Sequence, residues 1–446
     1  MPAPSLRRSC HRLCLLLPLT VLFAGPAMAD NLLEAYQQAF ATDPALAQAR
    51  DQLQAEMQGK PLARSALLPH LGAAASVGDN TARITGFGAP ISTGYLSNSY
   101  SVSLTQAVFN GQAFTALKQA DSRIQAGEAA LAYTEQQLAL QVTTAYFNVL
   151  QAQAQDRVAE KQEKLLDSIY RQTQANLQVG TGDIIAVREA QARLDAAKAD
   201  VIKARNAVAV AQRSLQRLTH HPVGILKDLG RFEAMGPQPD QTQPWVDMAL
   251  KSQPLLHQAE AQLRTAQEQV EYNRRERWPK INLQGIASHS LGSPFPGVDM
   301  NQIGASLNLS MPLYEGGSIS ATVQQSQAQA QASVDNLANL RDEVTLNTQT
   351  TFLNLQDSVA QLHAAKETMV SAKVSLEGTR KGYEVGTRSI IDLLNTATDY
   401  IRAEQDYNVA LYNQVVARVQ LKAAAGVLTA ADLESINALL SKNGRS

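Results

Sequence analysis

The order of segments in this chain occurs twice, and no other feature narrows the possible folds as far. Residues 39–44 align with residues 249–254 at an offset of 210. The offset is 206 where the Val-Gly-Thr triplet at 179–181 aligns with the triplet at 385–387. Shared alanine-rich composition does not place proline and glycine in register in this way, so the chain is a duplication. We predict a first structural repeat at residues 30–235, a second at 236–428 and a C-terminal equatorial segment at 429–446.

Each repeat begins with a helical segment that ends at a proline. Residues 43–68 and 245–278 have the composition of helices, and Pro69 and Pro279 follow them. Proline cannot continue the ladder of helical hydrogen bonds. One helix of about 30 residues is therefore expected at the start of each repeat.

Two segments of alternating apolar and polar residues follow each of these helices. In one of them serines separate Tyr100, Val102 and Leu104, and residues 302–311 alternate in the same way. A period of two predicts a strand with one apolar and one polar face. About ten residues suffice for a tilted strand to cross a bilayer, and a face of Ser, Thr, Asn and Gln suits a water-filled lumen. The alternative is a small soluble sheet that packs its apolar face on a helix.

A very long helical segment without proline comes next in each repeat, at residues 110–178 and 316–384. At about 1.5 Å per residue each would reach roughly 100 Å, which indicates a coiled coil or an extended assembly. Each segment turns at Val-Gly-Thr and returns through residues 183–218 or 389–425. Glycine suits such a turn because it adopts positive φ just past a helix end. Thr181 with Asp183, and Thr387 with Ser389, offer N-caps to the returning helices.

The first 29 residues are predicted to be a cleaved signal peptide. Arginines precede an apolar run at residues 13–23, and Ala27-Met28-Ala29 forms a small-x-small cleavage site. Cys10 and Cys14, the two cysteines of the chain, lie ahead of that site, so the mature protein has no disulfide and no thiolate metal site. Cleavage also removes three of the 39 Lys and Arg residues and none of the 40 acidic ones, which leaves a net charge of −4. That charge argues against nucleic acid as a partner.

An exported chain with these strands can cross a membrane as a closed barrel, but not alone. After residue 29 no apolar stretch approaches the ~18–20 residues of a membrane-spanning helix. Four strands cannot close a barrel, because the smallest single-chain barrels use about eight. We therefore expect a fold that is mainly α with a small β part. Three copies would supply about twelve strands, enough to close a barrel.

Signals for an enzyme or a metal centre are missing from the sequence. It has no nucleophile elbow, no phosphate-binding loop and no metal-ligand spacing. His220 and His221 are adjacent, which suits the end of a helix better than a metal site. We expect no catalytic residues, no cofactor and no bound metal. A periplasmic coiled-coil adaptor is the alternative function, but it leaves the membrane-length strands without a role.

The chain resembles the TolC family of outer-membrane efflux and type I secretion channels from about residue 31 to 440. The most specific stretch is residues 382–394, Gly-Tyr-Glu-Val-Gly-Thr-Arg-Ser-Ile-Ile-Asp-Leu-Leu. The Leu-Pro and Trp-Pro joints at 68–69 and 278–279, and the return at 312–317, are also similar to the family. The resemblance implies a homotrimer in the outer membrane of a Gram-negative bacterium, extending into the periplasm. Its outer-membrane β-barrel, with four strands per chain, would be continuous with a long periplasmic α-helical barrel. It also implies a mixed α/β girdle around the tunnel, at residues 219–243 and 428–446.

The resemblance also implies residues for a periplasmic gate that opens like an iris. Tyr383 and Arg388 match positions that tie the gate, and Asp392 matches a ring of acidic residues that narrows it. Asn395 stands where a second acidic ring often occurs. The usual partners on the first hairpin, a Thr-Asp pair, are replaced by residues 185–186, Ile and Ala. Asp183 is the alternative partner of Arg388.

Partners follow from the same resemblance. The channel is expected to take its cargo from an inner-membrane transporter of the ABC or RND type through a periplasmic adaptor (a membrane fusion protein). The barrel is expected to contact outer-membrane lipid. The two tips are predicted to dock the adaptor, through Val179, Gly180, Thr181, Val385, Gly386 and Thr387. The sequence leaves open whether the cargo is small toxic compounds, secreted proteins or both.

Overall fold

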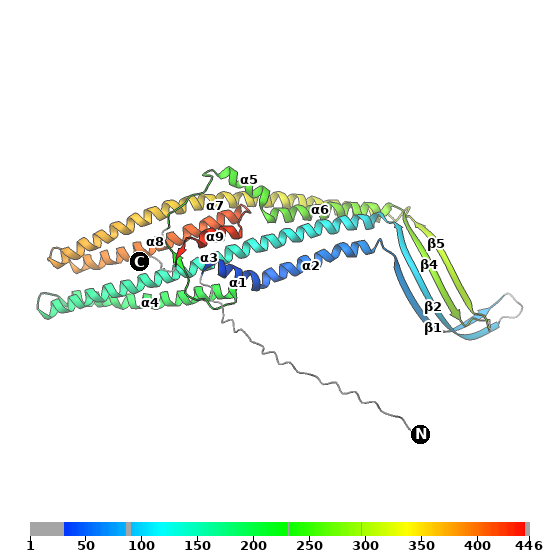
Figure 1. Cartoon of the computed structure of the whole chain (residues 1–446), viewed down its shortest axis with the longest axis horizontal. Coiled ribbons are helices and arrows are strands. Elements are labelled where there is room, and N and C mark those ends of the chain that lie inside the picture. Colours follow the sequence, from blue (N-terminus) through cyan, green and yellow to red (C-terminus); the bar gives the residue numbers. More distant parts are fainter. Residues whose placement is uncertain (1–30, 86–90, 231, 296, 442–446) are drawn as a thin grey trace, which may run out of the picture.

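The computed structural model describes residues 31–85, 91–230, 232–295 and 297–441. The predicted signal peptide at residues 1–29 lies outside the described residues. The molecule is long and narrow, with a sheet at one end and two helical hairpin tips at the other (Figure 1). The order of elements from α1 to α4 recurs from α5 to α8, with two long strands inside each series.

Four strands form one antiparallel sheet in the order β1-β2-β4-β5. Their bounds are His70–Ile84 for β1, Ile91–Phe109 for β2, Lys280–Leu291 for β4 and Met300–Ser310 for β5. The register aligns Ala73, Val102, Ala287 and Ile303 across the four strands. Side chains of one cross-strand row point to the same face, so the predicted apolar face is continuous from edge to edge. β1 and β5 are the two edges of this sheet.

The first two strands are longer than the predicted ten residues. β1 has 15 residues and β2 has 19. Beyond the pairing of Asn98 with Leu291, the β1–β2 hairpin continues as a two-stranded ribbon up to the pairing of Ile84 with Ile91. The Gly, Ser and Pro residues of the stretch 83–97 predict a loop, but residues 83–84 and 91–97 are paired as strand. Turn-forming residues such as Gly94 suggested a loop, whereas backbone pairing within the hairpin sets the strand ends.

The helix expected at residues 245–278 is broken in two, and the helix expected at residues 43–68 is preceded by a separate short helix. α1 (Leu32–Thr42) precedes α2 (Pro44–Ser65), and α5 (Thr242–Ser252) precedes α6 (Pro254–Arg274). Asp43 and Gln253 stand at the breaks with extended backbone, ψ 123° and 117°. A residue before proline is pushed out of the α region, so each proline starts a new helix. Asp43 also caps α2 by accepting a hydrogen bond from the backbone N–H of Leu46 at 2.9 Å.

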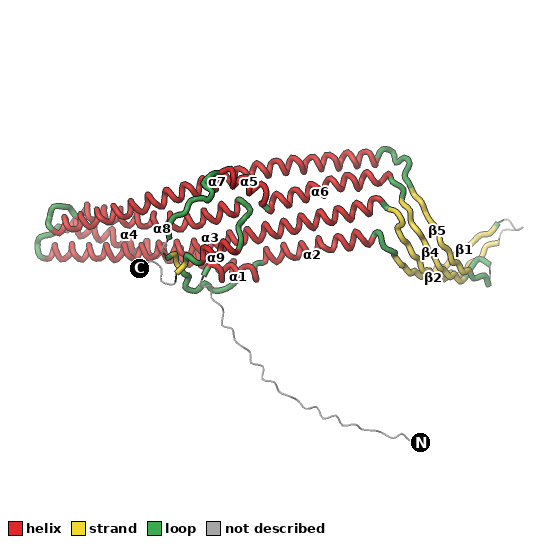
Figure 2. The backbone as a smooth tube through the Cα atoms, turned by 45° about the horizontal axis from the view of Figure 1, so that its top comes forward, coloured by secondary structure: helices red, strands yellow, loops and turns green. Residues whose placement is uncertain are grey.

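The long helices and their returning partners agree with the prediction. α3 (Gly111–Gln178) and α7 (Ser318–Glu384) return through α4 (Ile184–Thr219) and α8 (Ile390–Ala424). In the half nearer the sheet, four helices lie side by side in the order α2-α3-α6-α7 (Figure 2). In the half nearer the tips, the order of contacts is α4-α3-α8-α7. No helix in the described part of the chain combines the length and the apolar character needed to cross a membrane.

The main hydrophobic core lies at mid-length, where a small girdle packs on the long helices. β3 (Asp228–Leu229) pairs with β6 (Leu440–Ser441), and α9 (Ala430–Asn437) lies beside them. Tyr146 of α3 is fully buried and donates a hydrogen bond to the carbonyl of Lys227 at 2.8 Å. His220 is the C-cap of α4, as its position at a helix end suggested, with a left-handed φ of 56°. The girdle thus ties the connecting segments to the hairpins.

The joints between sheet and helices hold the two repeats together. Trp278, at the start of the second strand pair, stacks on Phe109, at the end of the first, with ring centroids 6.2 Å apart and an interplanar angle of 8°. Gly111 leaves room for this indole, because a Cβ at that position would lie 2.9 Å from Trp278 Cε3. The guanidinium of Arg275 lies 5.0 Å from the centroid of the same indole. The sheet is therefore fixed to the α3–α6 pair through one aromatic cluster.

Candidate functional site

Both hairpin tips have the same backbone geometry. Gly180 and Gly386 have φ of 76° and 78°, the positive values predicted for the turn. Thr181 donates its backbone N–H and its hydroxyl to the carbonyl of Asn176, at 2.9 and 3.2 Å. Thr387 makes the same two bonds to Gly382, at 2.8 and 3.0 Å. The threonines therefore close the ends of α3 and α7, whereas they were expected to help cap the returning helices.

Apolar side chains surround both turns and are exposed in the single chain. Val179 and Val385 are 73% and 74% exposed. Ile184, Ile185 and Ile391, in the first turns of the returning helices, are at least half exposed. Among the described residues, apart from the glycine and its two chain neighbours, no atom lies within 4 Å of a Cβ built on Gly180 or Gly386. Each tip is therefore an open, partly apolar knob that another pair of helices could approach.

The N-caps of the returning helices are Asp183 and Ser389, as predicted. Asp183 accepts a hydrogen bond from the backbone N–H of Ile185 at 3.1 Å. Ser389 and Asp392 form a reciprocal capping box, in which the Ser389 Oγ accepts from Asp392 N–H at 3.1 Å. The Asp392 Oδ2 accepts from the backbone N–H and the hydroxyl of Ser389, at 3.0 and 2.8 Å. Asp392 therefore also starts α8, a local role that the family pattern did not reveal.

The capping box changes the acidity of Asp392. The hydrogen bonds from the backbone and hydroxyl of Ser389, with a smaller contribution from the charge of Arg388, lower the pKa of the Asp392 carboxyl. The side chain is exposed to solvent. Asp392 is therefore ionised at neutral pH and presents a fixed negative charge one turn above the tip.

Tyr383 and Asn395 both contact the first hairpin, through partners that the sequence did not indicate. Asn176 Nδ2 donates to the Tyr383 hydroxyl at 3.5 Å. Arg193 Nη2 donates to Asn395 Oδ1 at 3.4 Å. Asn176 lies in the last turn of α3, three residues before the expected tip at 179–181, and Arg193 lies on α4. A polar residue near each tip was the available signal, but many such residues occur along these helices.

Arg388 makes no hydrogen bond or ion pair with Asp183 in the described part of the chain, and each residue serves a local turn. Asp183 caps α4. The alkyl chain of Arg388 lies against Gly382, where an added Cβ would lie 2.7 Å from Arg388 Cγ. The guanidinium is thus held beside the turn. It is available to a neighbouring molecule.

Between the girdle and the tips, the two hairpins are joined by a second hydrophobic core. It combines Val158, Leu166 and Ile169 of α3 with Leu393, Leu394, Ala397 and Ile401 of α8, among others. The contact runs mainly between α3 and α8, because α4 and α7 lie on the outer sides of the pair. Movement of the second hairpin relative to the first would have to break or slide this contact.

A sheet of long strands that is continuous with paired helical hairpins defines an outer-membrane channel protein. The family model for the outer membrane efflux protein matches residues 35–220 and 245–427. The chain belongs to this outer membrane efflux protein family. Membership identifies the protein as a channel of the outer membrane rather than an enzyme, and it favours the channel over a periplasmic adaptor.

Individual relatives support the same assignment over nearly the whole chain. The outer membrane protein TolC of Escherichia coli is 29% identical over 434 residues, covering 94% of this chain and 87% of TolC. The alkaline protease secretion protein AprF of Pseudomonas aeruginosa is 29% identical, covering 94% of this chain and 89% of AprF. The crystal structure of the Campylobacter jejuni CmeC outer membrane channel matches with a TM-score of 0.76, 16% identity and 98% coverage of both chains.

The capping box predicts a measurable change in local stability. Ser389→Ala removes the hydroxyl that accepts from the Asp392 N–H and donates to Asp392 Oδ2. The first turn of α8 should therefore open several-fold more often. Hydrogen exchange measured by mass spectrometry should be faster over residues 389–394, with Ser371→Ala in the middle of α7 as the control. Because the folded pKa of Asp392 is depressed, the stabilisation is present above the unfolded pKa of about 3.9 and is lost as the pH falls through the lower folded value. Unchanged exchange in Ser389→Ala would show that the box does not hold the helix start.

Proposed function

We propose that three copies of this chain close into one duct that carries cargo through the outer membrane. The observation that carries this proposal is the pair of open edges. β1 and β5 each have a free side in the sheet, and unpaired backbone groups are not viable in lipid. Pairing of β5 with β1 of the next copy would satisfy both edges. Three four-stranded sheets would give a barrel of about twelve strands, within the range of known outer-membrane barrels.

The helical half supports the same closure. α2 and α7 are the edges of the layer that continues from the sheet, and α4 and α7 are the edges near the tips. α7 carries large apolar side chains that remain exposed in the single chain at heptad-related positions, Leu346, Leu353 and Val374. Leu62 on α2 and Ile202 on α4 are 73% and 70% exposed. Helix contacts with neighbouring copies would bury these side chains.

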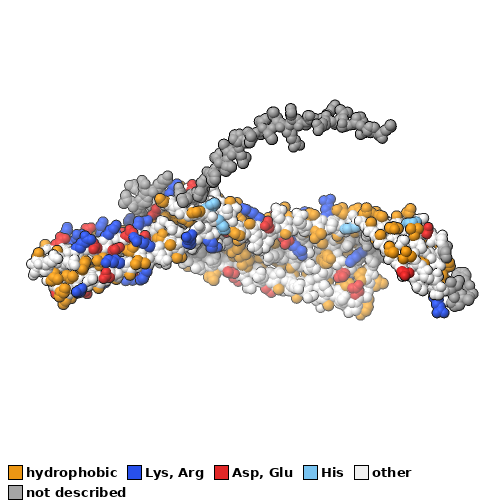
Figure 3. Space-filling view, turned by 90° about the horizontal axis from the view of Figure 1, so that it is seen from below, with side chains coloured by type: hydrophobic (Ala, Val, Ile, Leu, Met, Phe, Trp, Pro, Cys, Tyr) orange, Lys and Arg blue, Asp and Glu red, His pale blue; other side chains and the backbone are white. Residues whose placement is uncertain are grey.

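The distribution of charge fits a membrane end and an aqueous end. Charged side chains gather over the hairpin half in the face shown in Figure 3, whereas the sheet end shows mainly hydrophobic and uncharged side chains. The apolar row through Ala73, Val102, Ala287 and Ile303 would face lipid, and the opposite face would line the lumen. The loops at the sheet end would then face the outside of the cell, and the tips would lie in the periplasm.

Export through this duct would need an adaptor and an inner-membrane transporter. The relatives include TolC, an outer membrane protein, and AprF, named for the secretion of alkaline protease. Both kinds of cargo, small toxic compounds and secreted proteins, therefore remain within the proposal. The transporter would be of the ABC or RND type, and the periplasmic adaptor would bind the tips.

The gate of the duct is proposed to lie at the tips. Tyr383 lies in the last turn of α7, Arg388 in the turn that connects the helices, and Asp392 and Asn395 in the first two turns of α8. Arg388 makes no side-chain hydrogen bond or ion pair within its own chain among the described residues, so we propose that it bonds to the first hairpin of the next copy. Three symmetric bonds of this kind would hold the duct closed, and three Asp392 carboxylates would give the opening a negative potential. Asp183 is the proposed acceptor on the neighbouring copy.

Single-channel recording in planar bilayers tests the channel and the gate together. Arg388→Ser should raise the conductance, because loss of a charge-assisted hydrogen bond worth about 1.5–3 kcal/mol frees the hairpins to separate. The matched control is Arg380→Ser, since Arg380 pairs with Glu384 on its own helix at 3.5 Å and should not affect the gate. A preparation that forms no channels would refute the proposed function. Channels of equal conductance in both variants would refute the gate at Arg388 alone.

Adaptor docking at the tips predicts a difference between two substitutions of Gly386. Asparagine tolerates a φ of 78° and adds little bulk, so Gly386→Asn should keep the turn and the partner. Gly386→Trp fills the space that an approaching helix pair would need and should abolish co-purification of the adaptor after cross-linking in cells. Mass spectrometry of the captured complex gives the result. Capture of the same adaptor by both variants would place docking elsewhere on the chain.

A further inference from the structure

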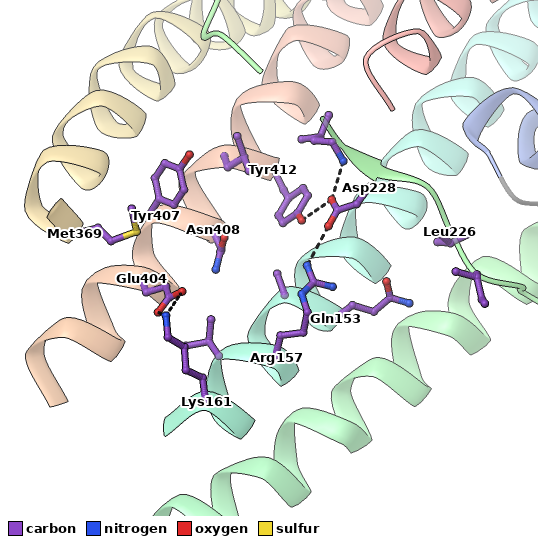
Figure 4. Close-up of a pocket in the computed structure, with 15 residues that line it drawn as sticks. Gln153, Arg157, Lys161, Leu226, Asp228, Met369, Glu404, Tyr407, Asn408 and Tyr412 are labelled. Atoms are coloured by element: carbon purple, nitrogen blue, oxygen red, sulfur yellow. Dashed lines mark hydrogen bonds and ion pairs between the residues drawn. The ribbon is translucent and has the colours of Figure 1, made fainter. Parts of the chain in front are cut away.

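A cavity of about 790 Å³ lies where α3, α7 and α8 meet the segment that contains β3 (Figure 4). Its lining is unusual for these hairpins because charged side chains from three elements face it. Arg157 and Lys161 come from α3, Glu404 from α8, and Asp228 from β3. These four side chains form two separate contacts, an upper one nearer the sheet and a lower one nearer the hairpin tips.

The upper contact ties α8 to the girdle. Asp228 accepts hydrogen bonds from both hairpins, from the Tyr412 hydroxyl to Oδ1 at 2.7 Å and from Arg157 Nη2 to Oδ2 at 3.0 Å. Two residues further along α8, Gln414 Nε2 donates to the carbonyl of Met235 at 2.8 Å. Tyr412 and Gln414 are both buried. This part of α8 is therefore fixed to the first hairpin and to the segment that wraps it.

The lower contact joins α3 directly to α8. Lys161 Nζ donates to the Tyr400 hydroxyl at 2.7 Å and lies 2.8 and 2.9 Å from the two carboxylate oxygens of Glu404. The ammonium also lies 4.8 Å from the centroid of the Tyr400 ring. Burial alone would lower the pKa of Lys161, but the hydrogen bonds to Glu404 and Tyr400 outweigh it and raise the pKa. Lys161 is therefore charged throughout the neutral range.

This contact is stronger in its geometry than the contacts nearer the tips. Among the described residues, two other side-chain hydrogen bonds join the hairpins below the girdle, Asn176 to Tyr383 at 3.5 Å and Arg193 to Asn395 at 3.4 Å. Both are at the outer limit of hydrogen-bond length and neither pairs opposite charges. A charge-assisted contact at 2.7–2.9 Å is roughly twice as strong as a neutral one. The firmest polar tie between the hairpins is thus well above the tips.

We propose that Lys161, Tyr400 and Glu404 form a lock that holds the second hairpin against the first while the duct is closed. The proposal rests on the proposed function of a gated channel. Lys161 is a positioning residue, because it acts on the opening through the placement of α8. The lock breaks when the tips separate, and the contact of Asp228 with Tyr412 remains as the pivot.

Distances along α8 indicate that the contact of Lys161 with Tyr400 and Glu404 breaks, rather than stays intact, when the tips separate. At 1.5 Å per residue, Glu404 lies about 12 Å below Tyr412, and the start of α8 lies about 35 Å below it. If α8 pivots near Tyr412, a tip movement of about 10 Å shifts Glu404 by about 3–4 Å. Such a shift exceeds what bonds of 2.7–2.9 Å tolerate. The cavity beside Glu404 gives the side chains room to rearrange during that movement.

Conductance in planar bilayers tests the lock, with charge reversal as the decisive comparison. Lys161→Met should raise the open fraction about three- to tenfold, a range that allows for the partial exposure of the pair. Lys161→Glu should have a larger effect because it places two carboxylates together. The double variant Lys161→Glu with Glu404→Lys restores a pair of opposite charges and should return the channel toward the closed state. Lys198→Met is the matched control, since Lys198 is similarly exposed and pairs with Asp195 on its own helix at 3.2 Å.

Two outcomes separate this proposal from the proposed function. An unchanged open fraction in Lys161→Met and Lys161→Glu, in a preparation where Arg388→Ser opens the channel, would overturn the lock and leave the channel intact. A raised open fraction that the double reversal does not lower would also overturn it, because the effect would then come from lost packing and not from the charged pair. If no variant conducts, the proposed function itself fails.

Discussion

The unpaired backbone at the two edges of the sheet is the constraint on which the rest of this structure depends. β1 and β5 expose rows of N–H and C=O groups, and hydrocarbon offers no water to satisfy them. If the sheet lies in the membrane, as proposed, its edges have to pair with those of another copy. The helical layer nearer the sheet also has two open sides, because its outermost helices, α2 and α7, continue from the edge strands β1 and β5.

Closure of the edges would determine what the hairpins can do. The α3–α8 contact is the main one between the hairpins of a single chain, and it contains a hydrophobic core with a charged contact at Lys161. α7 would meet the neighbouring copy along its exposed side. The second hairpin then has one interface within its chain and one between chains. A gate built in this way can open only if both interfaces yield, whereas the girdle keeps the upper part of α8 in place.

Local signals predicted the order of elements because proline and glycine act on the backbone where they stand. Pro69 and Pro279 follow the helices that were expected to end there, and Gly180 and Gly386 form the turns. The same reasoning missed the break before Pro254, although the restriction on a residue before proline predicts it, and it missed the short helix that precedes Pro44. The contacts between hairpins could not be predicted, because they join residues such as Asn176 and Tyr383, 207 positions apart. Their pairing depends on the rotation of each long helix about its axis, which the sequence pattern does not specify.

A disulfide between the two edges of the sheet tests the closure most directly, because residues 30–446 contain no native cysteine. One cysteine replaces Ala74 in β1, and a second replaces each residue of β5 in turn. Within one chain these edges are separated by two strands, roughly 14 Å at 4.8 Å per strand, which is too far for a disulfide. Oxidation should therefore give a covalent trimer on denaturing gels at one or two adjacent positions of β5. Monomers alone at every position would contradict closure of the duct by neighbouring copies.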